Sequence, residues 1–191
     1  MGMEPLDTAK QRWKRFFKTI GGFEDVMYRL SGGSLGRVRS GYTSYARSFS
    51  ERARHGDRTN FAMNEMADVQ SLARNVSEGN RYYGINLTNI YNDTRPNTVE
   101  FRYFNSSLDP KQLQANVKVA NAVMVAAEKA RTRDDIVSEN MRKRGEMLRV
   151  QAIGSNSHSD HSAVKKFVDI LFPRKKDKDH ILSVYANNQW A

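Results

Sequence analysis

One short segment carries side chains of opposite charge at a spacing that brings them together. Thr98–Phe104 (TVEFRYF) is rich in strand-forming residues, and side chains in a strand alternate between two faces. Glu100 and Arg102 are therefore expected on one face, about 6.5–7 Å apart at the backbone. A carboxylate is a hard ligand for Mg²⁺, and a guanidinium binds phosphate oxygens through two donors. The pair could hold a phosphate with its metal ion, or it could be a surface ion pair worth at most ~1 kcal/mol.

A second strand is expected just before the first. Arg81–Leu87 (RYYGINL) is also rich in strand formers, and the turn-forming residues of Asn92–Asn97 predict a loop between two antiparallel strands. Asn86 could orient a substrate amide or carboxylate, or simply bond to the sheet edge. Gly84 would allow a ligand or another chain segment to approach closely. Alternation places Arg81 and Asn86 on opposite faces, so only one of them can share a cavity with Glu100 unless a bulge intervenes.

Helices are expected to pack against this strand pair. The apolar side chains of the first segment recur at helical spacing and predict one buried face, made of Leu6, Trp13, Phe16, Phe17, Ile20, Phe23, Met27 and Leu30. Gly21-Gly22 should kink or split this helix, because glycine costs about 1 kcal/mol relative to alanine in a helix interior. Ser31-Gly32-Gly33 should end it.

The clearest helix start of the chain is at Asp109-Pro110. Asp109 suits the N-cap, Pro110 the first helical position, and Gln112 the glutamine position of a capping box. The apolar residues that follow predict one buried face, made of Leu113, Val117, Ala120, Met124 and Ala127. Shorter helices are expected over Asn64–Leu72, Asp135–Val150, Val164–Leu171 and Asp179–Ala186, with a break at Pro173.

These elements predict a single domain of the α+β class over residues 1–191, a small antiparallel sheet packed by helices. Within it, residues 1–30 are expected to be helical, 31–80 loop-rich, 81–104 a strand pair and 109–191 helical.

Composition narrows the classes of function. The 191 residues include 31 Lys and Arg against 21 Asp and Glu, a net charge of +10, and no cysteine. Disulfide scaffolds, cysteine zinc sites and thiol nucleophiles are therefore excluded. No apolar run approaches the ~18 residues of a membrane span, so a cytoplasmic protein with no membrane partner is expected. The positive charge favours anionic partners, but Lys and Arg are spread over the whole chain, which makes nucleic acid an unlikely partner.

The strand segments also resemble a known family. Arg81–Leu87, followed by Thr98–Asp109, is similar to the C-terminal half of the amidoligases, in the carboxylate–amine ligase superfamily related to glutamine synthetase and glutamate–cysteine ligase. Phe23–Leu30 and Phe167–Pro173 resemble the same family. The resemblance implies a partial glutamine-synthetase-like ligase domain that forms an amide bond through an acyl phosphate, with ATP and Mg²⁺ as cofactors.

The resemblance also implies roles for four residues. Glu100 would be a Mg²⁺ and nucleotide-phosphate ligand, and Arg81 would bind the nucleotide. Arg102 would stabilise charge on the transferring phosphoryl group, and Asn86 would line the same catalytic site. The partners would be a nucleotide together with small-molecule or peptide carboxylate and amine substrates.

The family's N-terminal strands, of the types G-x-E-x-E-F and G-x-H-V-H, have no counterpart in this sequence. Those strands supply most metal-binding carboxylates, so this chain alone is not expected to assemble a site of two or three metals. Three explanations remain open: the chain is the C-terminal part of a ligase, a second chain supplies the missing strands, or activity has been lost. Two other functions also stay open, a basic nucleic-acid-binding module without catalysis and an inactive partner subunit of a ligase.

Overall fold

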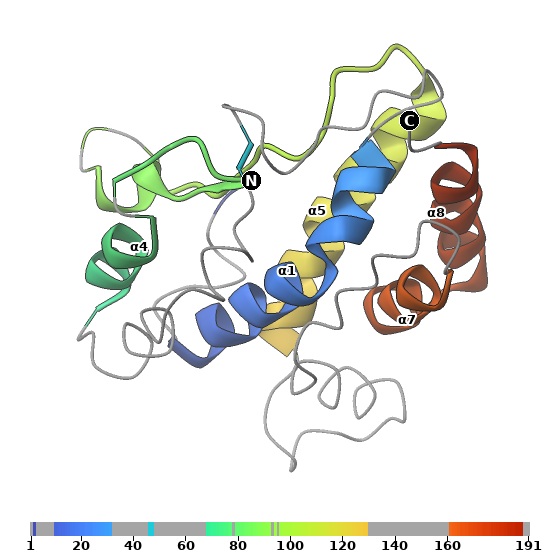
Figure 1. Cartoon of the computed structure of the whole chain (residues 1–191). Coiled ribbons are helices and arrows are strands. Elements are labelled where there is room, and N and C mark those ends of the chain that lie inside the picture. The colour runs from blue at the N-terminus through green and yellow to red at the C-terminus, as the bar shows by residue number, and fades with distance from the viewer. Residues whose placement is uncertain are drawn as a thin grey trace.

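Two long helices, α1 and α5, lie side by side through the middle of the fold, and smaller elements flank them (Figure 1). The computed structural model describes residues 2, 10–31, 46–47, 68–77, 79–92, 94, 96–129 and 161–188. In chain order the elements are α1 (Lys10–Ser31), α4 (Val69–Ser77), β1 (Ile85–Asn86), the 3-10 helix η1 (Thr88–Tyr91), β2 (Glu100–Phe101), α5 (Pro110–Lys129), α7 (Ser162–Leu171) and α8 (Lys175–Asn187). The described residues form mostly helices and one small antiparallel sheet, which confirms the predicted α+β class.

The apolar stripe of α1 is buried as its spacing predicts. Every predicted member within the described residues is at most 8% exposed: Trp13, Phe16, Phe17, Ile20, Phe23, Met27 and Leu30. Leu6 lies outside the described residues. The backbone leaves helical geometry at Phe23 (φ −130°, ψ 19°), directly after Gly22, which confirms the predicted kink. The helix ends at Ser31, also as predicted.

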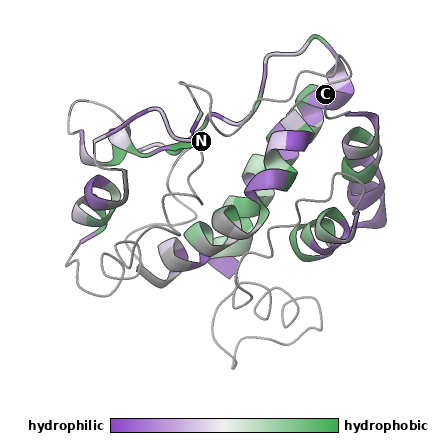
Figure 2. Cartoon of the chain, viewed as in Figure 1, coloured by the Kyte–Doolittle hydropathy of each residue, from purple (hydrophilic) through white to green (hydrophobic). Residues whose placement is uncertain are grey.

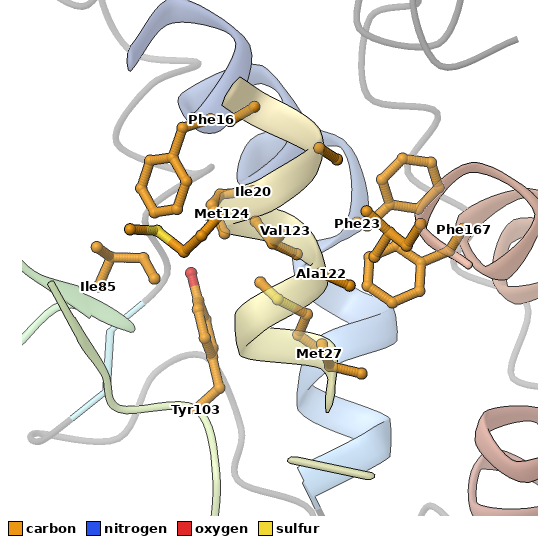
Figure 3. Packing of buried hydrophobic residues seen from close by; sticks show 14 of the residues in the cluster. Phe16, Ile20, Phe23, Met27, Ile85, Tyr103, Ala122, Val123, Met124 and Phe167 are labelled. Carbon is orange, nitrogen blue, oxygen red and sulfur yellow. The ribbon is translucent and has the colours of Figure 1, made fainter. Parts of the chain in front are cut away.

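The core lies on both sides of the α1–α5 pair. Figure 3 shows Ile20, Val123 and Met124 between the two helices, with Tyr103 and Ile85 on the strand side and Phe23 with Phe167 of α7 on the other. The rings of Phe23 and Phe167 lie 5.2 Å apart. Hydrophobic and hydrophilic residues alternate along the helices in Figure 2, as expected of helices that each bury one side. One continuous core therefore joins the strand pair to α7.

At the start of α5, one sequence prediction is confirmed and one is wrong. Asp109 caps the helix by accepting a 2.9 Å hydrogen bond at Oδ1 from the backbone N–H of Lys111. Gln112, predicted to complete a capping box, instead turns into the core and donates to the carbonyl of Leu30 at 2.6 Å. The last carbonyls of a helix have no partner within the helix, and this tertiary contact supplies a donor to one of them at the end of α1.

The buried face of α5 also differs from the prediction. Ala120, Met124 and Ala127 are buried, but Leu113 is 46% exposed and Val117 is 68% exposed. Gln112, Ala115 and Asn116 are buried in the first turns instead. The helix turns this side inward because the Gln112 amide donates to the Leu30 carbonyl at the end of α1 and to the side-chain oxygen of Asn116. This orientation moves Leu113 and Val117 to the outside.

The strand pair is much shorter than the predicted span of 81–104. β1 and β2 have two residues each and pair antiparallel, and η1 occupies part of the connection. The side-chain oxygen of Asn86 accepts a 3.0 Å hydrogen bond from the N–H of Thr88, an Asx turn that bends the chain out of the strand. Single bridges extend the pairing on both sides, Arg47 beside Tyr83 and Gly2 beside Thr98.

The remaining helices follow the sequence with shifted ends. α7 covers the predicted Val164–Leu171, and α8 begins four residues before the predicted Asp179, after the break at Pro173. α4 overlaps the predicted Asn64–Leu72 at residues 69–72 and continues to Ser77, while 64–67 lie outside the described residues. The helix predicted over Asp135–Val150 lies outside them entirely. None of the helices in the described ranges combines the length and apolar character needed to cross a bilayer.

We predict that two aspartate substitutions on α5 change the free energy of unfolding by very different amounts. Met124→Asp buries an unpaired charge at a position with 0% exposure and should lower the free energy of unfolding by at least ~3 kcal/mol. Val117→Asp, at a position 68% exposed, should change it by no more than about 0.5 kcal/mol. Urea denaturation followed by circular dichroism measures both values. Equal destabilisation by the two variants would contradict the observed orientation of α5.

Candidate functional site

Asn86 and Glu100 lie directly opposite each other on the antiparallel strand pair. The register pairs Asn86 with Glu100 and Ile85 with Phe101. The side-chain amide of Asn86 donates a 2.6 Å hydrogen bond to Oε2 of Glu100. Asn86 is only 5% exposed, whereas the Glu100 side chain is 47% exposed. A buried amide therefore orients a carboxylate that still faces solvent.

Arg102, directly after β2, completes this group from the same side as Glu100, as strand alternation predicts. Its Nη1 lies 3.1 Å from Oε1 of Glu100, so each carboxylate oxygen has a different partner. The Arg102 side chain is only 16% exposed, so its guanidinium lies against the protein surface beside the carboxylate. A carboxylate accepts about four hydrogen bonds, so both oxygens of Glu100 retain acceptor capacity for a ligand.

Arg81 joins the group through an aromatic ring. The guanidinium carbon of Arg81 lies 5.7 Å from the ring centroid of Tyr82, and that of Arg102 lies 5.8 Å from the same centroid. Both distances are within the range of cation–π attraction. The structure thus brings all four predicted site residues into one surface region, with Tyr82 linking Arg81 to the other three.

Gly84 and Tyr103 fix the strand pair on the core. A β-carbon on Gly84 would overlap the Tyr103 ring at Cε1, so only glycine allows the ring to pack against the backbone. The Tyr103 hydroxyl donates a 2.7 Å hydrogen bond to Oε1 of Glu24, a residue of α1 that is 2% exposed. The close approach expected at Gly84 is therefore made by a side chain of the same molecule.

The environment of Tyr103 favours the protonated phenol. Burial raises the pKa of Tyr103 well above its usual value, and the nearby Glu24 carboxylate raises it further. Deprotonation would place two negative charges together in a buried site, since Tyr103 is 0% and Glu24 2% exposed. The hydrogen bond that holds the strands to α1 is therefore intact throughout the neutral range.

The site suits a cation held by one protein carboxylate. The described residues contain no group of three or more His, Asp or Glu side chains that could enclose a metal ion. Mg²⁺ commonly takes one or two carboxylates and completes its shell with water and substrate phosphates. Glu100 fits that mode, because it is oriented and half exposed.

The comparisons with known proteins place the chain. A family model described as "Putative amidoligase enzyme" matches residues 1–124. The chain belongs to this amidoligase family. The matched residues include α1, the strand pair and the first part of α5, and therefore all four site residues of this family member. Phe167–Pro173, which also resembles the family, lies beyond the match. No curated protein and no solved structure is significantly similar to the chain.

Local sequence patterns do not identify two features of this candidate site. The sequence gives no role to Tyr82 as the partner of both Arg81 and Arg102, because side-chain directions outside the strand do not follow alternation. The bond between Tyr103 and Glu24 joins residues 79 positions apart. The signal available for it is the placement of Glu24 next to Phe23 within the apolar stripe of α1, where a carboxylate needs a buried partner.

Two glycine-to-alanine variants test how the strand pair is seated. Gly84→Ala should lower the free energy of unfolding by more than ~2 kcal/mol, because the new methyl group meets the Tyr103 ring. Gly22→Ala, with no atom within 4 Å, should raise it by about 0.5–1 kcal/mol through the lower conformational entropy of the unfolded chain. Urea denaturation of both variants measures these changes. A neutral Gly84→Ala would contradict the observed contact.

We also predict a pH effect of Tyr103. The native state keeps the phenolic proton at pH values above about 10, where the unfolded state loses it, so the free energy of unfolding falls as the pH rises through this range. Tyr103→Phe should remove that part of the slope, and at neutral pH it should cost about 1–3 kcal/mol because buried Glu24 loses a donor. Urea denaturation between about pH 8 and 11 compares the two proteins. Parallel pH profiles would rule out the raised pKa.

Proposed function

We propose that this amidoligase-family chain contributes the phosphate-handling side of an ATP-dependent carboxylate–amine ligase. The observation that carries the proposal is the arrangement of Asn86, Glu100 and Arg102 on one face of the β1–β2 pair, within the residues that match the family. An oriented, solvent-facing carboxylate next to a guanidinium can bind a metal ion and a phosphate at the same place.

Each residue would have its own task in that reaction. Glu100 would hold Mg²⁺, which supplies positive charge to the nucleotide phosphates. Arg102 would bind the phosphoryl group and stabilise the charge that spreads over its oxygens during transfer. Asn86 keeps the carboxylate in position through its 2.6 Å hydrogen bond, and Arg81 would add a second positive charge for the nucleotide.

The overall reaction would proceed in two transfers. A carboxylate oxygen of one substrate would attack the terminal phosphorus of ATP, with ADP leaving, to give an acyl phosphate. The amine of the other substrate would then attack the acyl carbon, and phosphate would leave with the bond electrons. Small-molecule or peptide carboxylates and amines are the proposed substrates. A second chain or segment would complete the site, since the described residues contain no group of three or more His, Asp or Glu side chains that could hold a metal ion.

Binding of ATP to Glu100→Gln tests this function. The substitution removes the charge but keeps the hydrogen bond from Asn86 possible, so the affinity for ATP with Mg²⁺ should fall at least about tenfold, equal to ~1.4 kcal/mol. Affinity for ATP without Mg²⁺ should change little. Isothermal titration calorimetry with and without Mg²⁺ measures both.

A matched control uses another exposed carboxylate. Asp169→Asn removes a charge whose side chain is 57% exposed and paired with Lys178 between α7 and α8, and it should leave ATP affinity unchanged. The free energy of unfolding of Glu100→Gln should stay within about 1 kcal/mol of the parent value. Unchanged Mg²⁺-dependent affinity in Glu100→Gln would refute the proposal, as would a variant that unfolds, because Glu100 would then be a structural residue.

A further inference from the structure

The hairpin of α7 and α8 exposes a cluster of positive side chains. Lys165 and Lys166 on α7 are exposed, and so are three consecutive residues at the start of α8, Arg174, Lys175 and Lys176. Lys and Arg are spread along the sequence, but the fold brings these two separate runs onto neighbouring helices. In Figure 1 both helices lie on the opposite side of the α1–α5 pair from α4. We call these five residues the basic patch.

One ion pair shows that the two runs of the basic patch lie close together. Lys178 of α8 lies 2.6 Å from Asp169 of α7. The two lysines of the α7 run come one helical turn before Asp169, and the first two residues of the α8 run come one turn before Lys178. Residues three and four positions apart are neighbours on a helix surface, with β-carbons about 5–6 Å apart. The cations of the patch therefore surround this ion pair.

The acidic side chains of the hairpin do not neutralise the basic patch. Asp169 pairs with Lys178, and Asp177 pairs with Lys118 of α5. Within the described ranges, none of the five patch residues has an ion pair or a side-chain hydrogen bond. A third aspartate of the hairpin, Asp179, is exposed and can balance at most one of the five charges. The patch therefore keeps a net positive charge.

The basic patch does not serve the stability of α8. Residues 174–176 are at the N-terminal end of this helix, where the dipole and the unbonded N–H groups favour negative charge. Positive side chains there oppose the dipole and repel one another. A bound anion would instead be attracted by the side chains and by the dipole together. The arrangement therefore favours an anionic partner over a purely structural role.

The surroundings of the basic patch distinguish between kinds of anionic partner. The large apolar side chains that the described residues expose are Tyr82, Leu108, Leu113 and Val117, and none of them is on α7 or α8. Protein interfaces are depleted in Lys and use aromatic contacts, and helices that bind a membrane surface insert apolar side chains. A nucleic acid requires neither, because neutralising its closely spaced phosphates releases counterions and supplies the non-specific affinity.

We propose that the α7–α8 hairpin binds the phosphate backbone of a nucleic-acid duplex through the basic patch. The described part of the hairpin exposes no Phe, Tyr or Trp ring on which unpaired bases could stack, so the contact is with the backbone and tolerates any sequence. The inference is independent of the proposed function, since Figure 3 shows α7 and the strand pair on opposite sides of α1 and α5.

Fluorescence anisotropy with a labelled DNA duplex of about 20 base pairs and arbitrary sequence tests this proposal. Two double variants, Lys165→Gln with Lys166→Gln and Arg174→Gln with Lys175→Gln, should each weaken binding at least about fivefold at ~50 mM salt. Each should also make the slope of log K against log salt concentration shallower by about one to two, because phosphate contacts are lost.

A control variant removes the same number of charges elsewhere. Arg74→Gln with Lys129→Gln neutralises two exposed cations, on α4 and at the C-terminal end of α5, and should change the affinity less than about twofold. Thermal unfolding of each variant checks that the fold is intact. Asp179→Asn removes the exposed carboxylate beside the patch and should strengthen binding about two- to threefold, so the test does not depend on the lysine variants alone.

Four outcomes would overturn the inference. The first is a parent protein that does not bind the duplex at ~50 mM salt. The second is equal weakening by the control variant, which would assign binding to the net charge of +10 and not to the patch. The third is unchanged or weaker binding by Asp179→Asn. The fourth is binding of phosphatidylserine vesicles without binding of the duplex, which would indicate a membrane surface instead.

Discussion

The hydrogen bond from Tyr103 to the buried carboxylate of Glu24 is the contact on which the site depends. A pair of strands with two residues each has little stability of its own, so the position of Asn86 and Glu100 must be imposed from outside the ladder. Tyr103 does this from two sides: its ring packs on Gly84 of one strand segment, and its hydroxyl is fixed on α1. Its ring also packs edge-to-face with that of Tyr28, whose hydroxyl donates to the carbonyl of Ala46. The solvent-facing site is thus attached to the most deeply buried part of the molecule.

Two sets of polar groups have different functions in this arrangement: one fixes the strands on the core, and the other can contact a ligand. On the core side of the strands, Glu24 and the Tyr103 hydroxyl are buried and hydrogen-bonded to each other. This favours one position of the strands on α1, because any other would leave a buried polar group unpaired. On the solvent side of the strands, Glu100 and Tyr82 are partly exposed and can contact a ligand. A site built on such a rigid base can orient a ligand with little reorganisation when it binds.

The sequence predicts the local part of this arrangement well and its long-range part poorly. Strand alternation correctly places Glu100 and Arg102 on one face, and helical spacing identifies the buried stripe of α1, because both patterns depend on neighbouring residues. The prediction for Gln112 is wrong because its side chain could bond either within a local capping box or to the distant carbonyl of Leu30. Local sequence rules describe only the capping box. The exposure of Leu113 and Val117 follows from the same contact. The partners of Tyr82 and Tyr103 depend on how separate elements meet, which no single stretch of sequence encodes.

The amide groups at the end of α1 have a consequence for cooperativity. Asn188, at the C-terminal end of α8, donates to the carbonyls of Arg29 and Leu30 and to the side-chain oxygen of Gln112, while Arg29 donates to the carbonyl of Asn188. The last turn of α1 is therefore completed by a residue far outside the span that matches the family. Without α8, the carbonyls of Arg29 and Leu30 would lose the Asn188 amide as a donor, and the Arg29 side chain would lose its aromatic cover. Hydrogen bonds and packing thus join helices of the matched span to a helix beyond it, so α1, α5 and α8 should exchange their amide hydrogens as one block.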